Sequence, residues 1–128
     1  MRVLLDTHAF LWWNAGDDRL SRVASEVIRD GRNQILISVA SIWEVAIKVA
    51  KGQLELPEDV QRYVDARLAS NRWLPLSIEP RHAVRAGGLP PLHRDPFDRV
   101  LIAQSQVEAI PSVTTDTLIH RYDVETIW

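Results

Sequence analysis

Acidic side chains follow several of the short apolar segments of this sequence. The acids at the most informative positions are Asp6, Glu44, Asp95, Asp98 and Asp116. Carboxylates that are brought together without partners repel one another and raise each other's pKa values. A hard cation such as Mg²⁺ or Mn²⁺ removes that repulsion and prefers oxygen ligands. These acids are therefore candidate ligands of a divalent metal ion, provided that the fold gathers them.

Each acid also has a purely structural explanation. Asp6, Asp95 and Asp116 precede expected helices, where Asp is a favoured N-cap worth about 1 kcal/mol. Glu44 follows Ser41 at the spacing of a capping box. Capping accounts for each residue separately, but it does not require all of them to meet at one edge.

Short apolar segments alternate with segments of helical spacing along the chain. Strands are predicted over 3–5, 35–39, 73–78 and 110–114, with an edge strand over 124–128. Helices are predicted over 9–13, 20–28, 41–51, from 57 onwards, over 80–86 and over 97–108, and the Pro-rich segment 89–96 is predicted to be a loop. Strands that are apolar on both faces and separated by helices indicate a parallel sheet with helices on both sides.

The sequence therefore predicts an α/β fold, a three-layer α/β/α sandwich, in one compact domain over residues 1–128. In an open parallel sheet, the functional crevice lies beyond the carboxyl ends of the strands. This topology brings acids that are far apart in sequence to one edge of the sheet.

Composition excludes several classes of protein. The chain has no Cys, which excludes a disulfide framework, a thiolate zinc site and a Cys nucleophile. Its formal net charge of -2 argues against binding nucleic acid by bulk electrostatics alone. The apolar run before Asp6 is too short for a signal peptide or a membrane span, so we expect a cytoplasmic protein that does not contact membranes.

The segments around the acids resemble PIN-domain ribonucleases and, within them, the VapC-type toxins of bacterial toxin–antitoxin pairs. The segments that carry the resemblance are Leu4–His8 with Trp12-Trp13, Ser38–Lys48, His93–Ala103 and Val113–Asp116. Any one of these is a weak signal, but four in order over nearly the whole chain are specific.

The resemblance implies a quartet of Asp6, Glu44, Asp98 and Asp116 that binds one or two Mg²⁺ or Mn²⁺ ions, with Asp95 as a secondary ligand. It implies an endoribonuclease that uses this metal to hydrolyse RNA phosphodiester bonds with water and without a side-chain nucleophile. It also implies a VapB-like antitoxin that blocks the acidic site, and a homodimer.

Further residues are assigned to the substrate and to partners. The candidates for holding the phosphates of the RNA are His93, Arg94 and Arg99, although exposed Arg side chains are more often only solvated. Trp12 and Trp13 are predicted to line a groove for an antitoxin segment or a dimer interface, because exposed aromatic rings typically anchor partners. Trp43 is expected to pack in the core.

Two other function classes stay open. A phosphotransfer or phosphatase domain with an Asp nucleophile can use a similar sheet, but such domains pair acids after the first strand and place a Lys after the last. Here Asp6 stands alone and no Lys follows Lys51. A PIN-like module that only binds a partner or RNA would keep the fold and lose the acids, and this chain has them.

Overall fold

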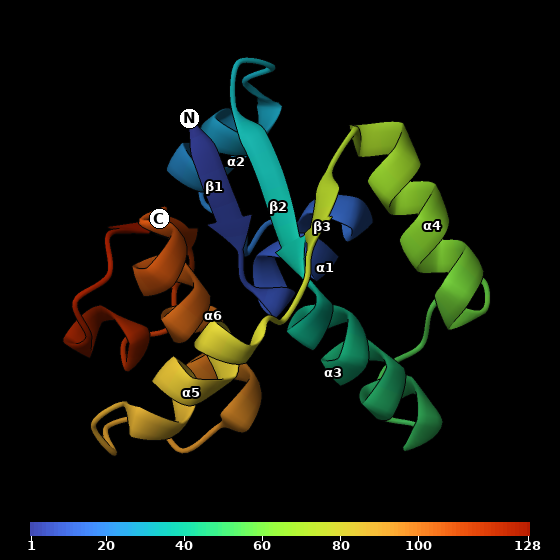
Figure 1. The fold of residues 1–128 in the computed structure, drawn as a ribbon. Helices are drawn as coiled ribbons and strands as arrows, with labels where there is room; N and C mark the ends of the chain where they lie inside the picture. Colours follow the sequence, from blue (N-terminus) through green and yellow to red (C-terminus); the bar gives the residue numbers. More distant parts are fainter.

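The computed structural model describes residues 1–128 and contains one five-stranded sheet in the order β3-β2-β1-β4-β5 (Figure 1). The strands are β1 (Arg2–Leu5), β2 (Gln34–Ser38), β3 (Leu74–Leu76), β4 (Ser112–Val113) and β5 (Thr126–Ile127). All neighbouring pairs are parallel. The carboxyl ends of the five strands therefore lie at one edge of the sheet, called here the acidic edge.

Six α-helices and a short 3₁₀ turn, Ile119–Arg121, surround the sheet. The helices are α1 (Thr7–Ala15), α2 (Arg22–Arg29), α3 (Val39–Ala50), α4 (Val60–Asn71), α5 (Pro80–Gly88) and α6 (Pro96–Glu108). Helices α1, α2 and α4 pack on one face of the sheet, and α6 packs on the other with α5 against it. This arrangement confirms the predicted α/β/α sandwich.

Alternate residues of the central strand supply the two halves of the core. Val3 and Leu5 are fully buried on the face that also holds Phe10 of α1. Leu4 points to the opposite face, where it packs with Leu101 of α6. Because both faces of β1 are buried, its position is firmly set, and so is the position of Asp6 directly after it.

The ends of some elements differ from the prediction. The helix expected from Pro57 begins at Val60, because Asp59 is its N-cap and accepts a hydrogen bond from the Arg62 amide at 3.0 Å. The strand predicted over 110–114 is paired only at Ser112–Val113. The chain turns soon after that pairing, which brings Asp116 to the acidic edge.

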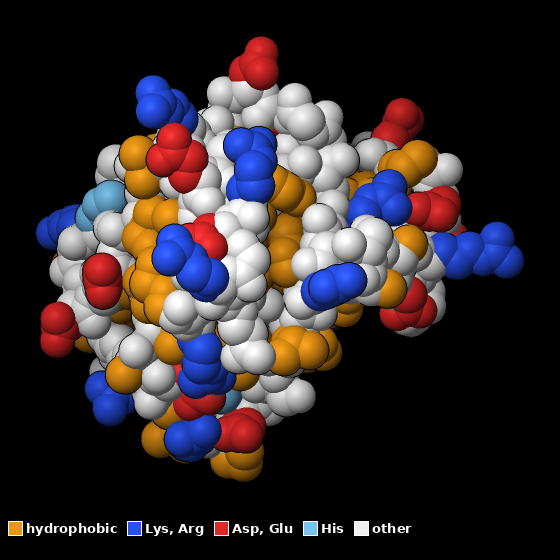
Figure 2. Space-filling model, turned by 90° about the horizontal axis from the view of Figure 1, so that it is seen from above, with side chains coloured by type: hydrophobic (Ala, Val, Ile, Leu, Met, Phe, Trp, Pro, Cys, Tyr) orange, Lys and Arg blue, Asp and Glu red, His pale blue; other side chains and the backbone are white.

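The surface carries mixed charge where it is seen from the edge at which the strands begin. Figure 2 shows Lys and Arg side chains interspersed with Asp and Glu on that face. None of the helices combines the length and the apolar character that a membrane crossing would require.

Candidate active site

Asp6 lies directly after β1 and is the N-cap of α1. Its Oδ1 accepts a hydrogen bond from the Ala9 amide at 2.7 Å, so the capping explanation for this residue is correct. Its side chain is also buried, and burial raises the pKa of Asp6 above its ordinary value, against an opposing hydrogen bond from Thr114. A cap needs only one carboxylate oxygen, and a buried acid with a raised pKa is poised to receive a cation.

Glu44 lies inside α3 and is buried beside α1. The N-cap of α3 is Ser38, whose hydroxyl accepts from the Ala40 amide at 3.0 Å, so the capping-box explanation for Glu44 is wrong. Its Oε1 accepts a hydrogen bond from the Thr7 hydroxyl at 2.7 Å, and its Oε2 is 3.1 Å from Lys48 Nζ. Thr7 is the neighbour of Asp6 in the chain, so this bond joins the two acids through α1.

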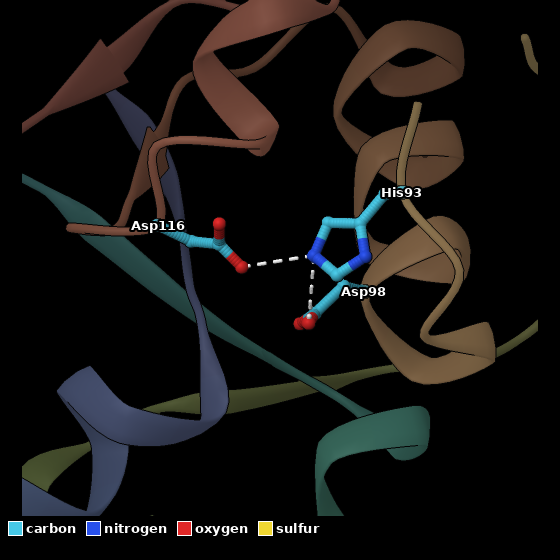
Figure 3. A group of neighbouring side chains, drawn as sticks. All are labelled: His93, Asp98 and Asp116. Atoms are coloured by element: carbon cyan, nitrogen blue, oxygen red, sulfur yellow. Dashed lines mark hydrogen bonds and ion pairs between the residues drawn. The ribbon is translucent and has the colours of Figure 1, made fainter. Parts of the chain in front are cut away.

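His93, Asp98 and Asp116 form a compact cluster at the same edge (Figure 3). The imidazole Nε2 of His93 is 2.9 Å from Asp116 Oδ2 and 3.2 Å from Asp98 Oδ2. The three side chains come from the loop before α6, from the first turn of α6 and from the segment after β4. Their polar atoms lie within 4.8 Å of one another, so the two carboxylates are close enough to share a metal ion.

The hydrogen bonds of His93 fix the position of its proton. Nδ1 accepts a hydrogen bond from the Asp95 amide at 3.2 Å. In the neutral ring the proton must then be on Nε2, which donates toward Asp98 and Asp116. A metal ion would require a lone pair on Nε2, so His93 in this tautomer orients the two carboxylates and is not itself a ligand.

The acids affect one another electrostatically across the whole edge. Burial, together with the neighbouring carboxylates of Asp95, Glu44 and Asp116, raises the pKa of Asp98 to about 7, against the opposing effect of His93. Asp116 also raises the pKa of Asp6. The four predicted acids thus lie close enough to form one field of negative charge.

Asp116 differs from the buried acids. Burial would raise its pKa, but hydrogen bonds from His93 and from the Leu118 amide hold the pKa of Asp116 below its ordinary value. Its Oδ1 accepts a hydrogen bond from the Leu118 amide at 2.8 Å. This bond closes a turn before the 3₁₀ segment, so Asp116 is not the N-cap of an α-helix. Asp116 is therefore ionised at neutral pH without any metal.

Asp95 is the N-cap of α6, as its structural explanation predicts. Its Oδ1 accepts from the amides of Phe97 at 2.8 Å and Asp98 at 3.3 Å. Asp95 also raises the pKa of Asp98. Its main role in the structure is to start α6 and so to orient Asp98 toward the acidic edge.

Arg99 anchors the loop 89–95. Its two terminal nitrogens donate to the backbone oxygens of Ala86, Leu89, Pro90 and His93 at 2.8–3.1 Å. These bonds engage both terminal nitrogens of Arg99, whose contact with a substrate phosphate stays a prediction. Arg94, in contrast, is exposed next to His93.

Three residues that support the site were not predicted from the sequence. Thr7 and Lys48 both contact Glu44, and Lys48 could have been found from its i, i+4 spacing to that acid. The Tyr122 hydroxyl accepts from the His93 amide at 2.7 Å and donates to the Pro90 oxygen at 2.7 Å. Nothing near Tyr122 in the sequence indicates this contact.

The exposure of the tryptophans differs in part from the prediction. Trp43 is 60% exposed, so its expected place in the core is wrong, and its ring meets Phe97 edge-on with centroids 5.2 Å apart. Trp13 packs on the buried Trp73, and its Nε1 donates to Asn71 at 3.1 Å. Trp12 is half-buried and keeps part of its ring at the surface.

A family profile for the PIN domain matches residues 3–125 of the chain. The chain belongs to the PIN domain family. The match contains the acidic edge and residues of every strand of the sheet except the last.

Two relatives from Mycobacterium tuberculosis extend this result. Over 130 residues the PIN chain is 29% identical to the protein named Ribonuclease VapC22, covering 98% of each protein. Over 66 residues it is 41% identical to Ribonuclease VapC16, and this match covers 50% of the chain and 47% of VapC16. The stronger local identity thus spans about half of that relative, whereas the weaker one spans the whole length.

Solved structures with the same fold include components of two toxin–antitoxin complexes. A chain of VapBC2 from Rickettsia felis, bound to a promoter DNA fragment, matches with a TM-score of 0.73 and 18% identity over 98% of this chain and 97% of that chain. A chain of a toxin–antitoxin complex from Klebsiella pneumoniae matches with a TM-score of 0.62 and 21% identity over 90% and 87%. At these identities the similarity shows the PIN fold alone.

Proposed function

We propose that this PIN-domain chain is a divalent-metal-dependent endoribonuclease that acts as the toxin of a toxin–antitoxin pair. The observation that carries the proposal is the mutual electrostatic effect of Asp6, Glu44, Asp98 and Asp116, acids from four separate parts of the chain, at one edge of the sheet. The ribonuclease names of both relatives support the reaction, since one of them aligns over the full chain.

The residues present fit a hard divalent cation, Mg²⁺ or Mn²⁺. They offer carboxylate oxygens, and the carboxylates of Asp95, Glu44 and Asp116 add to the effect of burial in raising the pKa of Asp98, as is expected of acids gathered without a cation. Asp6, Asp98 and Asp116 would hold the ion, with Glu44 beside them. When bound, such an ion lowers the pKa of water and stabilises negative charge on a phosphate.

The chain's own side chains prepare this edge for a phosphodiester. His93 donates from Nε2 to Asp116 and lies 3.2 Å from Asp98 Oδ2, and so it orients both carboxylates. Thr7 does the same for Glu44. Arg94, exposed next to His93, is the residue proposed to contact a substrate phosphate.

The toxin role implies two protein partners. An antitoxin segment that covers Trp12 and the acidic edge would block access of RNA; Trp13 contributes less, because its ring is engaged with Trp73. A second copy of the chain, in a homodimer, is the other proposed partner. Light scattering of the purified chain measures the second of these assemblies directly.

The test of the reaction compares matched substitutions of Asp. Asp98→Asn and Asp6→Asn should each lower metal-dependent RNA cleavage at least about a hundredfold and abolish growth inhibition. Asn caps a helix as well as Asp does, so Asp6→Asn should stay folded. Asp59→Asn is the control, because it changes the N-cap of α4 in the same way without touching the acidic edge.

Three outcomes would contradict the proposal. Full RNA cleavage by the Asp98→Asn variant would show that the reaction does not depend on these acids. Calorimetry that finds no Mn²⁺ binding to the wild type would favour a module that only binds partners. Capture of a phosphorylated Asp6 would favour an Asp nucleophile and a phosphotransfer reaction.

A further inference from the structure

A cavity of about 450 Å³ opens beside the acidic edge, between α1 and the segment that joins α3 to α4. His8 of α1 and Lys48 of α3 both lie in its wall. Lys48 Nζ is 3.1 Å from the Glu44 carboxylate, and His8 is on the first turn of the helix that Asp6 caps. The cavity therefore adjoins the acidic edge, and its volume is in the range of sites that enclose small molecules.

Trp12 gives this cavity an aromatic wall. Its ring stacks on His8 with centroids 5.3 Å apart and planes 30° apart, and Trp128 meets it edge-on at 5.9 Å. These neighbours hold the indole in place while it stays half-buried at the cavity. Nucleobases stack on aromatic rings with little regard to base identity, because every base has a π-face.

Guanidinium groups lie over the aromatic rings of the cavity. Arg19 Cζ is 4.7 Å from the centroid of Trp12, and Arg67 Cζ is 4.4 Å from the centroid of Tyr63. Arg19 also pairs with Asp17 at 2.8 Å, but exposed pairs of this kind contribute little and can exchange for a phosphate. Aromatic rings next to cations are the combination that binds unpaired nucleic acid strands.

We propose that this cavity binds one unpaired nucleotide of the RNA: its base takes the place of the Arg19 guanidinium over Trp12, and its phosphate is held by the displaced Arg19 and by Lys48. The inference rests on the proposed ribonuclease function, because it places this nucleotide next to the bond that the acidic edge would cut. Bases inside a duplex are stacked on each other and cannot reach the ring, so only an unpaired nucleotide can enter the cavity.

Binding of a labelled, unpaired RNA of about eight nucleotides tests the proposal, measured by fluorescence anisotropy in an Asp98→Asn background so that the RNA stays intact. Trp12→Ala should weaken binding about tenfold, which is the effect of losing one base stack, whereas Trp12→Phe keeps a ring and should change it less than about threefold. Arg19→Gln should weaken binding and lower its dependence on salt.

Trp43→Ala is the matched control, because it removes an exposed indole outside the cavity, and it should bind RNA like its parent. An unlabelled RNA duplex should not compete. The proposal is overturned if Trp12→Ala and Arg19→Gln, both folded by circular dichroism, bind RNA with unchanged affinity. It is also overturned if Trp12→Ala weakens only the antitoxin complex, which would assign the cavity to that partner.

The two proposals fail in different ways. RNA binding that depends on Trp12, in a wild-type chain that cuts no RNA with Mg²⁺ or Mn²⁺, would overturn the ribonuclease function and leave the nucleotide cavity. RNA cleavage by the Trp12→Ala variant with an unchanged KM would overturn the proposal that the cavity binds a nucleotide, and it would leave the proposed ribonuclease function intact.

Discussion

The two halves of the acidic edge are held in place by different kinds of structure. In the strand-anchored half, Asp6 caps α1 and Glu44 lies in α3, and these helices directly follow β1 and β2. In the loop-anchored half, His93, Asp98 and Asp116 depend on the segments before α6 and after β4. The first half is set by a buried sheet and the second by side chains that bind loop backbone, so the second should be easier to displace.

Among the substitutions that compare the two halves, Arg99→Ala is expected to change the free energy of unfolding most. Four backbone oxygens of the loop-anchored half would lose their charged donor, and we expect the free energy of unfolding to fall by about 3 kcal/mol. Urea denaturation measures the loss. Arg94→Ala, at an exposed neighbouring position, should change stability by less than about 0.5 kcal/mol. Equal losses in the two variants would show that Arg99 does not anchor the loop.

Thr7→Val tests the strand-anchored half. The substitution keeps the shape of the side chain and removes the hydroxyl that donates to Glu44, which leaves a buried carboxylate with one donor fewer. We expect a loss of about 2 kcal/mol in the free energy of unfolding. Thr7→Ser, which keeps the hydroxyl, should recover most of this loss. If Val and Ser behave alike, the bond to Glu44 contributes nothing.

The raised pKa of Asp98 predicts a pH dependence that belongs to the loop-anchored half. Because the fold favours the neutral acid, its contribution to stability is present below about pH 4 and is lost as pH rises through the folded-state pKa of about 7. Between about pH 6 and pH 8 the metal-free chain should therefore lose about 1.4 kcal/mol relative to Asp98→Asn. Parallel stability profiles of the two proteins would contradict the assignment.

Metal binding should show the opposite trend. Asp98 must lose its proton to bind a cation, so affinity for Mn²⁺ should rise about tenfold from pH 6 to pH 8. Calorimetry in two buffers of different ionisation enthalpy measures the accompanying proton release. An affinity that does not change over this interval would mean that Asp98 is not a ligand.

The smallest effect is expected from Tyr122→Phe. The substitution removes only the hydroxyl that joins the amide of His93 to the oxygen of Pro90. A loss of about 1 kcal/mol is expected. Hydrogen exchange of the His93 amide should increase at the same time, while the Ala9 amide in the strand-anchored half should keep its protection. Increased exchange at both amides would show that the two halves are not independent.

The contrast between the halves explains how much the sequence could predict. Asp6 was readable because an apolar strand ends at it, and a strand buried on both faces fixes the position of the next residue. The sequence also identifies Asp98 and Asp116 as acids of the site. It does not predict that His93 is a hydrogen-bond donor to them, because the position of its ring depends on the amide of Asp95 and on the distant Tyr122. Contacts between a side chain and the backbone of a remote loop leave no periodic pattern.

Two further differences from the prediction lie in α3. Ser41 and Glu44 have the spacing of a capping box, but the α3 helix begins earlier because Ser38, the last residue of β2, is already its cap. The sequence analysis places Trp43 in the core, yet it is the neighbouring Glu44 that faces inward, and adjacent residues of a helix point in different directions. For the capping box, the start of α3 decided the outcome, and sequence patterns locate helix ends poorly.

The fixed tautomer of His93 makes the acidic edge observable by spectroscopy. An imidazole N–H that is shielded from solvent and held between two carboxylates exchanges slowly with water, so its proton gives a separate resonance in a nuclear magnetic resonance spectrum. That single signal should shift when a cation draws Asp98 and Asp116 away from the ring. Occupancy of the edge can then be monitored in the native chain without a label, a substrate or a substitution.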